Sequence, residues 1–144
     1  MHVWKRVVIG LSAFLYLSSG MAAKAIEGNW VIIDDKTGHR RALAQFAVKE
    51  GALNATIADI YPEPGDTGVC SACPGNFKNK PVRGLQFVWG LKENANGEWD
   101  GGYILDAKKG KIYRVKMSIK NNKLYVHGYI GVAMLGRTQV WVRA

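Results

Sequence analysis

The clearest chemistry in this sequence lies in two cysteines three residues apart, Cys70 and Cys73. A redox-active pair would place the first cysteine at a helix N-terminus, where the thiolate is stabilised, but these two lie in a proline-bracketed loop. A zinc site would need two further ligands, for which the chain after residue 25 offers only His39 and His127 besides carboxylates. Pro74 follows Cys73, so the haem-attachment pattern Cys-x-x-Cys-His is absent. We predict a structural disulfide, with a redox pair and a metal site as the alternatives.

Catalytic motifs are absent from the rest of the sequence. After residue 25 the serines are Ser71 and Ser118, and neither lies in a Gly-x-Ser-x-Gly elbow. Acid–base catalysis could use paired carboxylates, of which the sequence offers two groups, Asp34 with Asp35, and Asp59 with Glu63 and Asp66. Acids in such positions usually form turns or stay solvated, so we expect structural roles. The sequence therefore predicts no catalytic residue, no metal ligand and no cofactor, and a protein that is not an enzyme.

The first 25 residues have the pattern of an export signal. Lys5 and Arg6 precede an uncharged, mostly apolar run at 7–17, and small residues follow up to Ala25. This arrangement predicts a cleaved signal peptide over residues 1–25. The apolar run is too short for a spanning helix, which needs about 20 residues. We therefore expect a mature chain from Ile26 without a transmembrane segment, in the periplasm or secreted.

The charge of the remaining chain argues against nucleic-acid binding. The first 25 residues hold three of the 20 basic side chains and none of the 11 acidic ones, which leaves residues 26–144 with a net charge of +6. These bases are scattered singly, with Lys108, Lys109 and Lys111 as the only dense cluster, whereas a nucleic-acid reader concentrates them on one face. A net charge of this size is better explained by weak attraction to anionic lipids or glycans of the cell envelope. Residues 26–144 have the length of a single domain.

Short β-type runs between Gly, Asn and Asp clusters predict an all-β chain. The strands are expected at residues 28–33, 41–49, 52–60, 82–91, 97–105, 111–120, 123–130 and 135–143. A small eight-stranded antiparallel up-and-down barrel would leave no open sheet edge, and a sandwich is the alternative. The exception is residues 61–81, an irregular connection that holds both cysteines and every proline. Connections of that length are often functional.

The turn at Asn121 and Asn122 fixes one hairpin in detail. Both residues tolerate the positive φ of a type I′ turn, which pairs residue 120 with 123 and residue 115 with 128. The apolar face, including Val115, must then point inward. On the outer face we expect His127 to be solvated and Arg114 to stack on the ring of Tyr129.

Several short motifs resemble one bacterial family. They are Pro81-x-x-Gly84, Trp89-Gly90-x-Lys92, Trp99-x-Gly101-Gly102-x-Ile104-x-Asp106, Gly110-Lys111-x-Tyr113, Leu124-x-Val126-x-Gly128-Tyr129-x-Gly131 and Gly136-Arg137-Thr138-Gln139-x-Trp141-x-Arg143. Together they are similar to the domain of unknown function 2147 family over most of residues 26–144. Ala107 departs from the proline that the family usually places there. The resemblance implies a secreted lipocalin-like (calycin-type) barrel with no established activity and no agreed catalytic residues.

Gly28-Asn29-Trp30 is also similar to the Gly-x-Trp that opens lipocalins. In those barrels a basic side chain from the last strand covers the tryptophan. Closing an antiparallel barrel brings the end of the last strand beside the start of the first, so we expect Arg143, rather than Arg137, to cover Trp30 and close the barrel. Arg137 should fall opposite the turn at 34–36.

The function expected from these features is non-catalytic binding by a monomer. The ligand would be a small apolar molecule or a component of the cell envelope, in line with barrels of this size that hold one small ligand. One alternative is a protein interaction module that uses residues 61–81. The second alternative is a thiol–disulfide redox protein that uses Cys70 and Cys73.

Overall fold

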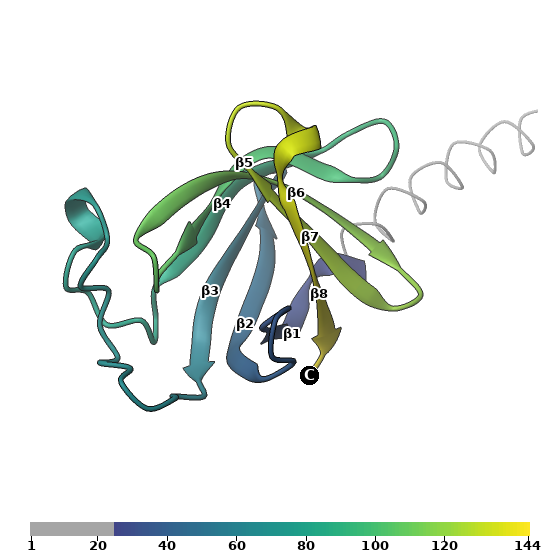
Figure 1. Ribbon diagram of the computed structural model, residues 1–144. Coiled ribbons are helices and arrows are strands. Elements are labelled where there is room, and N and C mark those ends of the chain that lie inside the picture. The colour runs from purple at the N-terminus through teal and green to yellow at the C-terminus, as the bar shows by residue number, and fades with distance from the viewer. Residues whose placement is uncertain (1–24) are drawn as a thin grey trace, which may run out of the picture.

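The computed structural model describes residues 25–144. Eight antiparallel strands form one closed barrel in which neighbours in sequence pair and β8 returns to β1 (Figure 1). The strands are β1 (Gly28–Ile33), β2 (Arg40–Lys49), β3 (Ala52–Ile60), β4 (Gln86–Glu93), β5 (Trp99–Asp106), β6 (Lys111–Lys120), β7 (Lys123–Tyr129) and β8 (Arg137–Arg143). The predicted eight-stranded antiparallel barrel is confirmed. The predicted signal peptide lies outside the described residues except for Ala25.

Three strands begin later than predicted, and β5, which was expected from residue 97, is late by two residues. β4 was expected from residue 82, but Leu85 N–H donates to the Val82 carbonyl (3.1 Å) and Gly84 N–H donates to that of Ile57 (2.7 Å). These bonds turn residues 82–85 before the strand can start. β8 was expected from residue 135, but the 3₁₀ helix η2 (Ala133–Leu135) precedes it.

Because consecutive strands run in opposite directions, their connections gather at two ends of the barrel. The terminal end holds the start of β1, the end of β8 and the connections 50–51, 94–98 and 121–122. The loop end holds the connections 34–39, 61–85, 107–110 and 130–136. The loop end therefore carries the long connections. Within residues 25–144 no helix has the length and apolarity to cross a bilayer.

Aromatic rings from distant strands meet inside the barrel. The Trp141 ring lies 6.3 Å from the Phe46 ring and 6.2 Å from the Phe87 ring, measured between centroids. An eight-stranded barrel is just wide enough for its own side chains to fill the interior. Other buried members of the same core come from all around the barrel and include Trp30, Ala44, Leu53, Ala55, Val88, Leu91, Trp99, Val115, Met117, Leu124 and Val126.

The β6–β7 hairpin has the predicted register. Asn121 and Asn122 have φ of 52° and 59°, and the pairing runs from Lys120 with Lys123 to Val115 with Gly128 and on to Arg114 with Tyr129. The residues predicted to face inward that are fully buried are Val115, Met117, Leu124 and Val126. Turn chemistry and alternation thus determined the register of this pair of strands correctly, but the expectation that Ile130 also faces inward is wrong, since this residue is 64% exposed beyond the end of β7.

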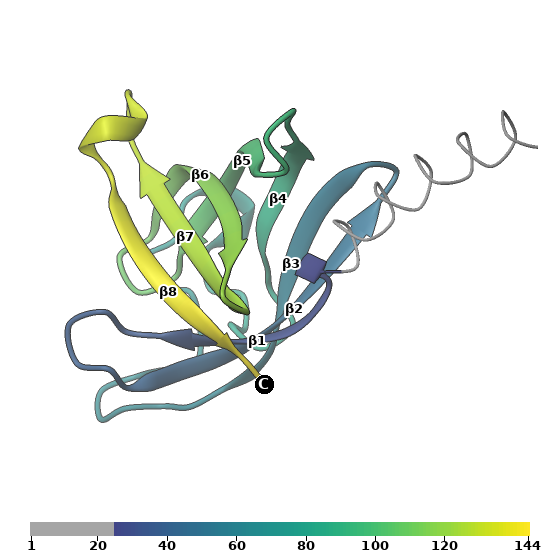
Figure 2. The same cartoon turned by 90° about the vertical axis from the view of Figure 1, so that its right-hand side faces the viewer.

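The barrel closes over a short seam between β1 and β8. Only two residue pairs join these strands, Trp30 with Arg143 and Val31 with Val142, and Figure 2 shows β8 rising away from β1 beyond that point. The Arg143 guanidinium lies 3.9 Å from the centroid of the Trp30 ring. Its Nη1 donates to the Glu27 carbonyl (2.9 Å) and its Nη2 to that of Ala25.

Arg137 lies at the other end of the seam. It donates from Nε to Asp35 Oδ2 (2.5 Å) and from Nη2 to Asp35 Oδ1. This bidentate contact ties the start of β8 to the β1–β2 turn. At this end of the seam β8 is no longer paired with β1. The two arginines therefore hold opposite ends of the seam by different interactions.

We expect Arg143→Ala to destabilise the barrel more than Arg137→Ala. Arg143 loses a cation–π contact, about 0.5–2 kcal/mol, and two hydrogen bonds to backbone carbonyls, which water partly replaces because the guanidinium is only partly buried. We therefore expect a loss near 2 kcal/mol for Arg143→Ala. Arg137→Ala loses a partly exposed ion pair, about 0.2–1 kcal/mol. Urea unfolding of both variants measures the difference, and a neutral Arg143→Ala beside a costly Arg137→Ala would contradict the closure role.

Candidate functional site

Cys70 and Cys73 lie at disulfide-bonding distance in the connection between β3 and β4, with Cα atoms 5.3 Å apart. Both are buried, at 0% and 3% exposed, and their Sγ atoms lie 3.9 and 3.8 Å from the Ala107 carbonyl oxygen. Gly110 sits so close to Ala72 that a Cβ atom there would clash with the Ala72 carbonyl. The pair therefore packs against the β5–β6 turn, where access to the sulfur atoms is restricted.

Residues 69–81, here called the cysteine loop, form a closed unit beside the barrel (Figure 1). Val69 and Pro81 are bridged at its base, and Cys70 N–H donates to the Lys80 carbonyl (2.8 Å). Its only helical part among the described residues is the 3₁₀ helix η1 (Gly75–Phe77), which begins after both cysteines. The helix N-terminus that activates the first cysteine of a redox pair is therefore missing at Cys70.

A row of stacked rings crosses the outer surface next to this loop. Phe77 stacks on Trp89 (centroids 5.6 Å apart), and Trp89 stacks on Tyr103 (5.9 Å). Trp89 and Tyr103 are partners across β4 and β5. The guanidinium of Arg114 follows, 5.6 Å from the Tyr103 centroid. We call Phe77, Trp89 and Tyr103 the outer aromatic row; the sequence reasoning missed it.

A depression of about 560 Å³ opens beside the outer aromatic row, between the cysteine loop and the start of β4. Its apolar lining includes Phe77, Leu85 and Trp89, and its polar lining comes from Lys80, Arg83 and Gln86. Arg83 is also 2.7 Å from Asp59, which holds its side chain at the rim. The depression thus combines ring surfaces with two cationic groups and one amide.

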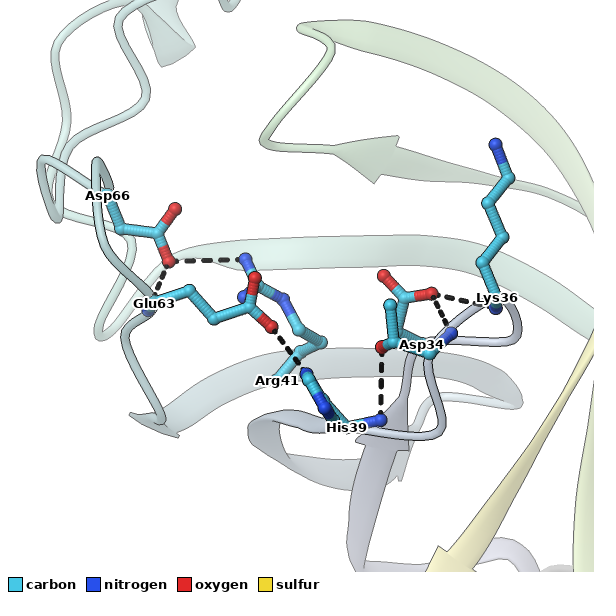
Figure 3. Close-up of polar contacts among 7 residues, drawn as sticks. Asp34, Lys36, His39, Arg41, Glu63 and Asp66 are labelled. Carbon is cyan, nitrogen blue, oxygen red and sulfur yellow. Dashed lines mark hydrogen bonds and ion pairs between the residues drawn. The ribbon is translucent and has the colours of Figure 1, made fainter.

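Charged side chains fasten the start of the β3–β4 connection to β2 (Figure 3). Arg41 donates from Nη2 to Asp66 (3.2 Å), and its Nη1 lies 2.8 Å from Glu63 as an ion pair without hydrogen-bond alignment. His39 Nδ1 lies 3.3 Å from the same Glu63. Nearby, Asp34 accepts from the backbone N–H groups of the turn that follows it.

Every carboxylate considered for acid–base catalysis has a lowered pKa. This holds for Asp34, Asp35, Asp59, Glu63 and Asp66. The largest cause is a hydrogen bond from a backbone N–H for Asp34, Asp59 and Asp66, a hydrogen bond from Arg137 for Asp35, and the close guanidinium of Arg41 for Glu63. A general acid at neutral pH needs a raised pKa. These groups are instead held ionised in turn and loop contacts.

Two outer-surface expectations differ in the structure. His127 was expected to be solvated, but its Nδ1 lies 2.7 Å from Thr138 Oγ1 and its Nε2 contacts the Ala133 carbonyl. Arg114 was expected to stack on Tyr129, its partner on β7, but it stacks on Tyr103 of β5. Among residues 25–144, no group of three or more His, Cys, Asp or Glu side chains is arranged to hold a metal ion.

Residues 28–143 match the family described as "uncharacterized protein conserved in bacteria (DUF2147)". The chain belongs to this family. The match covers all eight strands and the cysteine loop, so the predicted resemblance is confirmed. No curated protein matches the sequence.

Among solved structures the DUF2147 chain is similar to protein HP1028 from Helicobacter pylori, described as belonging to the lipocalin family. The two share 18% sequence identity and a TM-score of 0.70, over 83% of this chain and 82% of the other. At this identity the similarity shows the fold alone. The lipocalin-like barrel that the family resemblance implied is therefore confirmed as the fold.

We expect Cys70 and Cys73 to be oxidised to each other in this DUF2147 protein. Replacing both by serine should cost about 2 kcal/mol, because the closed ring is small, and should leave the barrel folded. Alkylation of the unreduced, denatured protein followed by mass measurement tests the bond, and urea unfolding with circular dichroism tests the variant. Two labelled thiols, or loss of the β-sheet signal in the variant, would contradict this expectation.

We expect Asp66→Asn to lower stability at neutral pH but not in acid. The pKa of Asp66 is lowered mainly by the Glu63 N–H and then by the charge of Arg41. Its stabilisation is therefore complete above the unfolded pKa of about 3.9 and is lost as the pH falls through the lower folded value. Urea unfolding should give a difference of about 0.5–1 kcal/mol near pH 7 that vanishes by about pH 2.

The matched control for this pH series is Glu50→Gln, because Glu50 lies in the exposed β2–β3 turn and no described contact joins its carboxylate to a base. A difference between wild type and Asp66→Asn that stays constant down to acid pH would show that the charge of Asp66 is not what stabilises the fold.

Proposed function

We propose that this DUF2147 protein is a non-catalytic, monomeric binding protein that holds a small amphipathic anion in the outer depression. The observation that carries the proposal is the lining of that depression: Phe77 and Trp89 offer ring surface, and Lys80 and Arg83 offer positive charge. Ligand sites typically combine an apolar lining with a few placed polar groups. The apolar part of the ligand would lie against the rings and its anionic group against the cations.

The packing of the barrel interior favours an outer site over the interior site expected from the fold. The rings of Phe46, Phe87 and Trp141 meet there within 6.3 Å between centroids. A ligand in the interior would have to displace these rings, each of which stabilises the core by its burial. A ligand in the outer depression would displace no ring of the core. Trp89, which lines the depression, is already held in place between Phe77 and Tyr103.

The state of the carboxylates supports binding rather than catalysis. Arginine and backbone N–H groups lower the pKa of each acid at the loop end that could pair for acid–base chemistry. The lipocalin-like fold is consistent with a small-ligand binder, as fold-level analogy. Export to the periplasm or beyond would suit a protein with a buried disulfide. Processing after Ala25 would retain the contacts of Trp30 with Ile26 and of Arg143 with Glu27.

A protein interaction through the cysteine loop is the second candidate. The loop is closed by its own hydrogen bonds and stands beside the barrel (Figure 1), which would present a rigid surface to a partner. The redox alternative has less support, because Cys70 and Cys73 are buried and thiol–disulfide exchange requires access to a sulfur atom.

Native mass spectrometry of the exported protein, purified from its own compartment, tests the proposed site. We expect an added mass on wild type that is lost in Trp89→Ala, and reduced about fivefold in occupancy by Lys80→Gln, since one charge contact contributes about 1 kcal/mol. The control is Tyr125→Ala, which removes an outer ring elsewhere, one that Lys120 covers. An added mass retained in Trp89→Ala would place the ligand outside the depression.

A further inference from the structure

The connection between β7 and β8 keeps apolar side chains in water. Within residues 130–136, here called the apolar loop, the exposed fractions are 64% for Ile130, 58% for Val132, 93% for Met134 and 80% for Leu135. Elsewhere in the described chain no exposed large apolar side chain exceeds 38%. Clustered apolar exposure of this kind usually marks a contact surface. Nothing in the proposed ligand site uses these residues.

The apolar loop has a defined shape. Leu135 N–H donates to the Val132 carbonyl (3.2 Å), and Gly136 N–H donates to that of Ala133 (3.4 Å). His127 contacts the Ala133 carbonyl and thereby ties the loop to β7. At its end Gly136 lies so close to the Gly128 carbonyl that a side chain there would clash. The turn therefore satisfies part of its own backbone, which lowers the cost of placing it in an apolar medium.

The charge of the chain is divided between its two parts. Residues 25–106 hold eight basic and eleven acidic side chains, a net charge of −3. Residues 107–144, which include the apolar loop, hold no acidic side chain and nine basic ones: Lys108, Lys109, Lys111, Arg114, Lys116, Lys120, Lys123, Arg137 and Arg143. The three lysines at 108–111 lie at the loop end, as the apolar loop does.

We propose that the apolar loop and the lysines at 108–111 dock this protein on an anionic lipid bilayer. Interfacial anchors combine apolar side chains that enter the acyl boundary with basic groups that meet anionic headgroups, and each basic group near such a surface contributes about 1 kcal/mol. The loop tip is a single helical turn, too small for the roughly 800 Å² per side of a standard protein interface. A deformable bilayer surface accepts such a tip and can meet the lysines of the same end of the barrel with its headgroups.

Flotation with lipid vesicles tests the docking, with protein expressed from the full sequence and purified as exported. Vesicles of equal parts phosphatidylglycerol and phosphatidylethanolamine should carry the protein at about 0.05 M salt and release most of it at about 0.5 M, where charges are screened. Vesicles of phosphatidylcholine alone should not carry it. The variant Met134→Asp/Leu135→Asp should reduce the vesicle-bound fraction at least tenfold, since it removes two apolar anchors.

A charge series separates the lysines from the general charge of the protein. Lys109→Gln/Lys111→Gln should lower the partition coefficient about 25-fold, which is about fivefold for each lysine. The matched control is Lys49→Gln/Lys92→Gln, with the same change in net charge but at the terminal end; it should leave binding within about twofold. Thermal unfolding of each variant checks that the barrel is intact.

Three results would overturn the proposal: no flotation with anionic vesicles, equal flotation with neutral vesicles, or flotation that Met134→Asp/Leu135→Asp leaves unchanged. Absence of flotation together with retention on a resin coated with poly-glutamate would favour an acidic protein as the partner instead. Trp89→Ala should float like wild type, so failure of the ligand site and failure of membrane docking are distinguishable.

Discussion

The barrel depends on closing a sheet at the one place where its strands barely pair. β1 and β8 share two residue pairs, whereas every other pair of neighbouring strands shares at least four. An unpaired edge there would expose backbone N–H and C=O groups to other chains. Side-chain contacts must therefore hold β1 and β8 together where backbone hydrogen bonds do not. Arg143 does this at the terminal end by lying over Trp30 and donating to the carbonyls before β1. Arg137 does it at the loop end through Asp35. The packing of rings inside the barrel depends on this closure.

Much of this architecture could be predicted because it follows from local rules. Alternation of side chains and the positive φ of Asn121 and Asn122 determine the β6–β7 register without any knowledge of the rest. The nearness of Arg143 to Trp30 follows from topology alone, since an antiparallel barrel must bring its last residues to its first strand. The family resemblance predicted the lipocalin-like fold but no function, because the motifs that carry the resemblance consist of strand and turn residues.

The outer aromatic row could not be predicted, because alternation fails in β4 and β5. Strict alternation would place Trp89 on the same face as Leu91. Between Val88 and Leu91, however, three steps along β4 face two along β3, and Gly90 at φ 77° makes room for the extra residue. Leu91 is therefore buried while Trp89 lies outside against Tyr103. A sequence shows that a glycine permits a bulge, but only the paired strands show whether one is formed. The same limit applies to His127, because one of its two partners, the Ala133 carbonyl, lies in a connection of irregular shape.

The two proposed surfaces belong to the same end of the barrel, and the closure of the barrel gives a physical reason for this. The depression opens at the start of β4, and the apolar loop precedes β8; both positions lie at the loop end. The terminal end is occupied by closure contacts, so a site placed there would compete with the interactions that hold β1 to β8. At the loop end β1 and β8 are no longer paired, so the connections there can vary without opening the seam between these strands. The ligand chemistry inferred from Trp89 and Lys80, an apolar body with an anionic group, is also the chemistry of the anionic bilayer on which we propose that the apolar loop docks.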